Sequence, residues 1–119
     1  MNIAYICCTL PNRDTINLYA SHRKYCEGDL HIFDDVDIPA SYPTTTRYQM
    51  AYEKIKKQYD YYMFIGDDCE FTPNFEKNII DGVEEVIKIT KDRRACVYPD
   101  DGIHGVALCT HPLFTRAVS

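Results

Sequence analysis

Short continuous apolar runs alternate with longer amphipathic segments along this chain. The runs have no helical period, which is typical of strands buried on both faces of a parallel sheet. They are Ile3 to Cys8, Leu30 to Phe33, Tyr61 to Ile65, Ala95 to Tyr98 and Val106 to Cys109. Three segments between them repeat apolar residues every three or four positions, which predicts helices over Asp14 to Cys26, Arg47 to Tyr59 and Asn74 to Ile89. We expect His111 to Ser119 to begin another helix.

The order of these elements predicts an α/β fold. Strands separated by single helices favour right-handed crossovers and a three-layer α/β/α sandwich with a mostly parallel central sheet. Gly28 is expected to end the first helix. No repeat or linker divides residues 1–119, so the chain is expected to form a single domain.

The run from Tyr61 to Ile65 ends in two adjacent carboxylates, Asp67 and Asp68, after Gly66. Ligands of open α/β sheets bind beyond the carboxyl ends of the strands. Two acids at such a place repel each other unless a cation or a shared proton is present. A divalent ion that carries substrate phosphates is a common solution, since Mg²⁺ is often held by one or two carboxylates. The alternative is an acidic turn that closes the strand and caps the next helix.

Acids also follow two other predicted strands. Asp34 and Asp35 come after the second strand, and Asp100 and Asp101 come after the fourth. In a parallel sheet these junctions open on the same edge, so a crevice lined by carboxylates is expected there. The Asp100–Asp101 pair is either a turn or the source of a catalytic base. His104 and His111 are either solvated or ligands in the late loops.

Composition excludes several classes of protein. A net charge of −5 argues against nonspecific nucleic-acid binding, which needs a basic surface. No apolar run approaches the ~18 residues that span a bilayer. The N-terminus lacks the basic region of a signal peptide, so a cytoplasmic location is expected. The six cysteines contain no Cys-x-x-Cys pair and lie in or beside apolar segments, which predicts buried, reduced thiols.

The segment Tyr62-Met-Phe-Ile-Gly-Asp-Asp-Cys-Glu-Phe-Thr-Pro-Asn-Phe resembles one found in glycosyltransferases with the GT-A fold. In that Rossmann-like family an Asp-x-Asp motif follows a central hydrophobic strand, and a Thr-Pro pair comes shortly after it. If Thr72-Pro73 sets the register, Asp68 matches the final, metal-binding acid of the motif. Gly66 stands at the first position, which leaves Asp67 as the neighbouring acid that would hold the ribose or the metal.

The resemblance covers nearly the whole chain and implies roles for further residues. It implies a nucleotide-sugar donor, an acceptor whose identity the sequence does not give, and Mn²⁺ or Mg²⁺ held by Asp68 and Asp67. It places Arg47 near the ribose or diphosphate and gives the base a hydrogen bond to Asp34 or Asp35. The loop that would border the nucleotide contains Thr9, Pro11, Asn12 and Arg13. Family members also carry a C-terminal acceptor portion, so this chain is expected to be a truncated piece, a minimal enzyme or a remnant that binds without turnover.

Other interpretations compete with this one. A strand ending in Gly-Asp-Asp is also found in the palm of viral RNA-directed polymerases, but the chain is too short for a polymerase and too acidic for a template channel. Receiver domains also gather acids at strand ends, yet no late strand here ends in a lysine. A non-catalytic α/β module that binds a nucleotide or a partner through its acidic edge remains the main alternative.

Overall fold

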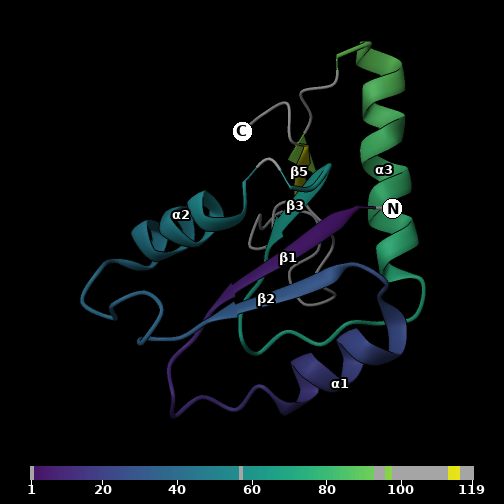
Figure 1. Ribbon diagram of the computed structural model, residues 1–119. Coiled ribbons are helices and arrows are strands. Elements are labelled where there is room, and N and C mark those ends of the chain that lie inside the picture. The colour runs from purple at the N-terminus through teal and green to yellow at the C-terminus, as the bar shows by residue number, and fades with distance from the viewer. Residues whose placement is uncertain (1, 57, 93–95, 98–112, 116–119) are drawn as a thin grey trace.

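The computed structural model describes residues 2–56, 58–92, 96–97 and 113–115. Up to residue 97, its helices and strands follow the predicted order (Figure 1). They are β1 (Ile3–Cys8), α1 (Ile16–Tyr25), β2 (Asp29–Phe33), α2 (Thr44–Ile55), β3 (Tyr61–Phe64), α3 (Phe75–Thr90), β4 (Cys96–Val97) and β5 (Leu113–Thr115).

The strands form one mixed sheet in the order β2-β1-β3-β5-β4. β1 lies between β2 and β3 and is parallel to both, with Ile6 opposite His31 on one side and Phe64 on the other. β5 pairs antiparallel with both β3 and β4. The prediction of an α/β fold with three parallel strands near the N-terminus is therefore confirmed.

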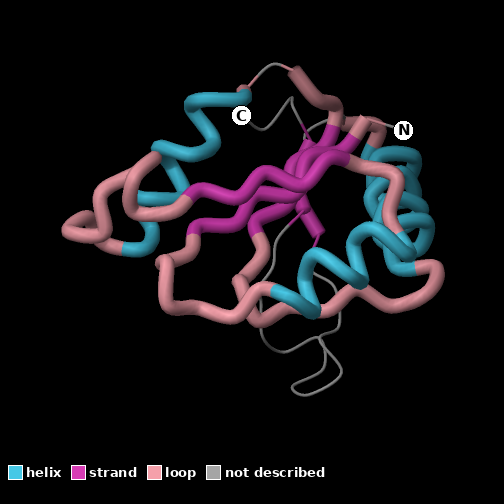
Figure 2. The backbone as a smooth tube through the Cα atoms, turned by 60° about the horizontal axis from the view of Figure 1, so that its bottom comes forward, coloured by secondary structure: helices cyan, strands magenta, loops and turns pink. Residues whose placement is uncertain are grey.

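Side chains of β1 alternate between two apolar clusters, because successive residues of a strand point to opposite faces. Ile3, Tyr5 and Cys7 pack with residues of α1 and α3, whereas Ala4, Ile6 and Cys8 pack with residues of α2. Figure 2 shows the strands between helices that lie on either side of them. Cys7 and Cys8, which are adjacent in β1, therefore face opposite sides of the sheet. Three cysteines whose side chains are described, Cys7, Cys8 and Cys26, are free thiols.

β3 is buried on both faces, as the absence of a helical period predicted. Tyr61 and Met63 belong to the cluster with α1 and α3, and Tyr62 belongs to the cluster with α2. Tyr59 is buried as well. These tyrosines are packing residues of the core. The loop that follows β3 therefore starts from a strand that is packed in the core.

Glu76 joins α3 to the connection between α1 and β2. Its carboxylate accepts hydrogen bonds from the Tyr5 hydroxyl at 2.8 Å and from the amides of Glu27 and Gly28 at 3.0 Å each. α1 ends at Tyr25, so the expectation that Gly28 ends this helix is wrong. Gly28 instead lies where the backbone passes close to Ile3, and that spacing leaves no room for a side chain.

Two other expectations differ from the structure. α2 begins three residues before Arg47 and ends at Ile55, so Tyr59 lies outside the helix, and its amide donates to the Tyr62 hydroxyl at 3.1 Å. The segment expected to begin a helix at His111 contains a strand instead, Leu113–Thr115. Its backbone pairs with β3 and β4, and such distant partners override local preference. The predicted strand Val106 to Cys109 lies outside the described residues.

Candidate functional site

Three loops meet at the edge of the sheet where β1, β2 and β3 end, because the three strands are parallel. We call this place the carboxyl edge and define it by residues 9–15 after β1, 34–43 after β2 and 65–74 after β3. The Thr9 amide donates to the Phe33 carbonyl at 2.8 Å, which continues the β1–β2 pairing into the loops. The Ile65 amide likewise donates to the Ile6 carbonyl at 2.9 Å. These hydrogen bonds therefore fix the points at which the three loops leave the sheet.

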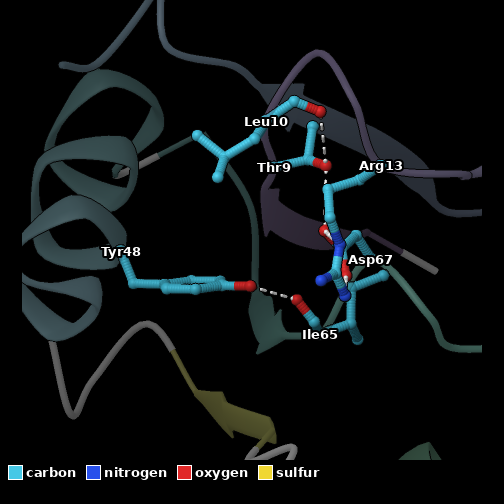
Figure 3. A network of polar contacts seen from close by, with 6 residues as sticks. All are labelled: Thr9, Leu10, Arg13, Tyr48, Ile65 and Asp67. Atoms are coloured by element: carbon cyan, nitrogen blue, oxygen red, sulfur yellow. Dashed lines mark hydrogen bonds and ion pairs between the residues drawn. The ribbon is translucent and has the colours of Figure 1, made fainter. Parts of the chain in front are cut away.

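A polar network joins the first and third loops (Figure 3). The guanidinium of Arg13 donates to both oxygens of Asp67, from Nε to Oδ2 at 3.0 Å and from Nη2 to Oδ1 at 2.9 Å. The hydroxyl of Thr9 donates to Asp67 Oδ2 at 2.9 Å. Hydrogen bonding and the charge of Asp67 raise the pKa of Arg13. The sequence predicted that all three residues line one site, and the structure brings them into contact.

The two neighbouring acids of this loop differ in their surroundings. The side chain of Asp67 is 14% exposed and is held by Arg13 and Thr9. Asp68 is exposed, and within the described residues its carboxylate accepts no hydrogen bond and forms no ion pair. The repulsion expected between adjacent acids is thus relieved at Asp67 by a protein cation, while Asp68 remains open to solvent.

The acids after β2 differ in a similar way. Asp34 closes its own turn, since its Oδ1 accepts from the amides of Val36 at 2.9 Å and Asp37 at 3.2 Å. In turn, Asp37 Oδ2 accepts a hydrogen bond from the Asp34 amide at 3.2 Å. Asp35 is exposed and has no partner among the residues that the structure describes. Of the two acids that the sequence offered for a base contact, Asp35 has the free carboxylate.

Arg47 lies beneath the carboxyl edge, in the first turn of α2, and is only 7% exposed. Its Nη2 donates to the carbonyl of Thr9 at 3.0 Å and to the carbonyl of Ile38 at 3.3 Å. Its Nε is buried without a hydrogen-bond partner. Arg47 therefore ties the loop after β1 to the loop after β2. The sequence indicated a residue near the site but not this contact with two backbone carbonyls.

The sequence did not indicate that Tyr48 makes a polar contact, because its spacing marked it as an apolar residue of α2. Its hydroxyl donates to the carbonyl of Ile65 at 2.5 Å, which fixes the start of the third loop (Figure 3). Burial raises the pKa of Tyr48, so the hydroxyl stays protonated and remains a donor. A tyrosine on the apolar face of a helix is the signal that points to such a contact, because its hydroxyl needs a hydrogen-bond partner when it is buried.

Of the remaining candidate residues, two lie in the described part of the chain and four do not. Pro11 and Asn12 are exposed in the first loop. Asp100, Asp101, His104 and His111 lie outside the described residues. Within residues 2–56, 58–92, 96–97 and 113–115, no cluster of three or more acidic, histidine or cysteine side chains is arranged to hold a metal ion. Among these residues, Asp67 and Asp68 would therefore leave a divalent ion in need of further ligands.

Comparison with family models, curated proteins and solved structures finds no match to this chain. Among the described residues, no helix has the length and apolar character needed to cross a membrane. The features that bear on function are therefore the α/β fold and the polar loops at the carboxyl edge.

Proposed function

We propose that this protein binds a nucleotide-diphosphate sugar at the carboxyl edge and is a metal-dependent glycosyltransferase, or the donor-binding half of one. The difference between Asp67 and Asp68 carries the proposal. Asp67 is already compensated by Arg13 and Thr9, so it maintains the shape of the loops. Asp68 is exposed beside it and makes no hydrogen bond or ion pair among the described residues, which suits a ligand for a cation.

Mn²⁺ or Mg²⁺ fits the residues present. Both ions prefer oxygen ligands and are commonly held by one or two carboxylates together with substrate phosphates. Asp68 would supply the carboxylate, and Asp67 would become a second ligand only if Arg13 left it. When bound, such an ion neutralises a diphosphate and favours its departure as a leaving group.

The other residues of the edge receive roles that are consistent with their positions. Asp35 is the acid available to a nucleotide base, and Arg13 is an exposed cation for the diphosphate. Thr9, Pro11 and Asn12 would border the nucleotide, and Arg47 would hold the first two loops at the spacing that the donor needs. Asp100 and Asp101 remain the proposed source of a catalytic base, and the acceptor is left open.

The helices pack against both faces of the sheet. α1 and α3 contribute to one apolar cluster of the sheet and α2 to the other. We infer that the chain forms a Rossmann-like α/β/α sandwich of the GT-A type. In such folds the donor lies beyond the carboxyl ends of the parallel strands, which is where Asp35 and Asp68 are found.

Calorimetric titration with UDP-, GDP-, CMP- and dTDP-sugars, with and without Mn²⁺, tests the proposal. We expect one donor to bind only when Mn²⁺ is present. Asp68→Asn keeps the size of the side chain and removes its charge, so it should abolish this binding with little loss of stability. Asp67→Asn should weaken binding less. Asp81→Asn is the control, because Asp81 is an exposed acid of α3 that pairs with Lys77. Equal binding by Asp68→Asn and the parent would refute the assignment.

One observation favours a second function, a non-catalytic module that binds a nucleotide or a partner. Arg13 compensates the charge of Asp67, so this carboxylate does not require a metal ion for its neutralisation. The same titrations separate the two functions. Binding that does not depend on Mn²⁺ and is retained by Asp68→Asn supports the module.

A further inference from the structure

Arg13 is the only basic residue in the three loops of the carboxyl edge. The same loops, residues 9–15, 34–43 and 65–74, contain a series of acids: Asp14, Asp34, Asp35, Asp37, Asp67, Asp68 and Glu70. Arg47, the nearest other cation named above, is buried and donates to backbone carbonyls. Among the side chains of these three loops, an anionic ligand therefore meets one exposed cation.

The Arg13–Asp67 pair has a geometry that another oxyanion can reproduce. Two parallel hydrogen bonds join the guanidinium fork to the two carboxylate oxygens, at 3.0 and 2.9 Å. Phosphate groups bind guanidinium in the same bidentate way. The side chain of Arg13 is 51% exposed while that of Asp67 is 14% exposed, so a ligand can reach the cation before it reaches the acid.

We propose that Arg13 is an exchangeable counter-ion that couples the binding of a diphosphate to the binding of a divalent cation. This inference rests on the proposed function. In the free protein Arg13 neutralises Asp67. A diphosphate takes Arg13 from Asp67, and the released carboxylate joins Asp68 in holding the cation. Each ligand thus removes the competitor of the other.

The exchange predicts effects of opposite sign from one substitution. Arg13→Gln removes the charge that competes with a cation at Asp67, so it should tighten the binding of a cation alone. The same substitution removes the contact to a diphosphate, so it should weaken the binding of that ligand. One unit charge about 4 Å away is worth about fivefold in affinity even at the dielectric constant of water, and more where the site is partly shielded. A loss of folding would lower both affinities together and cannot imitate this pattern.

Two titrations of the whole chain test the exchange. Mn²⁺ alone is titrated by the electron paramagnetic resonance signal of the free ion, and inorganic pyrophosphate is titrated by calorimetry in saturating Mg²⁺. For Arg13→Gln we expect Mn²⁺ to bind at least fivefold more tightly than to the parent, by the same Coulomb estimate, and pyrophosphate to bind at least fivefold more weakly. Arg13→Lys keeps the charge and loses the fork, so both changes should be smaller.

Arg23→Gln serves as the matched control. Arg23 is an exposed cation in the last turn of α1, which leads into the opposite end of the sheet, so neither affinity should change. Unchanged or jointly weakened affinities in Arg13→Gln overturn the inference. If Asp68→Asn still abolishes donor binding in that case, the proposed function stands without the exchange. If neither Mn²⁺ nor pyrophosphate binds the parent, the inference and the proposed function fail together.

Discussion

Gly28→Ala should destabilise the protein because the added methyl group has no space. A Cβ atom at this position would lie 2.3 Å from Ile3 Cγ2 and 2.8 Å from the Ile3 carbonyl oxygen. Ile3 is 1% exposed and lies in the core, so its side chain has little freedom to move away. The second contact is with backbone of a central strand, which cannot shift without disturbing its pairing with β3.

The loop cannot move away freely either. The Gly28 amide donates to Glu76 Oε2 at 3.0 Å, and the Gly28 carbonyl is 2.6 Å from His22 Nε2. Overpacking costs about 1–3 kcal/mol, and loss of a hydrogen bond to a charged group costs about 1.5–3 kcal/mol. Because relief of the clash incurs one of these two costs, we expect the free energy of unfolding to fall by about 1–3 kcal/mol. That is a large part of the stability of a small domain, typically about 5–15 kcal/mol.

Urea unfolding followed by far-ultraviolet circular dichroism measures this change, and Gly82→Ala provides the control. Gly82 is inside α3, and a Cβ there would meet no described atom within 4 Å apart from its chain neighbours and the backbone of its own helix. Alanine there should raise the free energy of unfolding by about 0.5–1 kcal/mol through helix propensity. The same chemical change is therefore expected to have opposite signs at the two glycines. A Gly28→Ala protein as stable as the Gly82→Ala protein would refute the packing argument.

Two further predictions concern Arg47 and His31. Arg47→Met should lower the free energy of unfolding by about 1–3 kcal/mol, because two backbone carbonyls lose a charged donor while a buried charge with an unpaired Nε is relieved. Urea unfolding checks this, and a Met variant as stable as the parent would mean that the relief dominates. Burial lowers the pKa of His31 below its usual value of about 6.5, so the unfolded chain binds the proton first. The contribution of His31 to stability should be full above about pH 6.5 and should fall as the pH drops toward the pKa of His31 in the folded protein. In His31→Gln the stability should fall less steeply. Urea unfolding midpoints measured between about pH 5 and 8 will show the difference. An equal slope in both proteins would contradict this assignment.

Hydrophobic periodicity alone determined most of the elements. β1 was predicted with its observed bounds, β3 differs from the prediction by one residue at one end, and α3 differs by one residue at each end. These segments are strongly patterned, and burial on one stripe or on both faces leaves a clear trace in the sequence. The acids beyond the strands were also visible there, since parallel strands bring their carboxyl ends to one edge.

Tertiary structure alone decided the pairing at the end of the chain. β5 follows β4 in sequence but lies between β4 and β3 in the sheet. Three residues with distant partners carry too little local information to distinguish a strand from a helix. For the same reason the role of Gly28 was visible only once Ile3 was placed beside it.

The difference between Asp67 and Asp68 was also decided by the folded structure. The sequence identified Asp67 and Asp68 as equal neighbours after a strand. The parallel register that sets Ile6 opposite Phe64 brings the loop after β1 beside the loop after β3. Arg13 and Thr9 can then reach Asp67, whereas Asp68 stays exposed. Side chains that are 54 and 58 positions apart in sequence meet only through that register, so no local pattern could have shown which of the two acids is free.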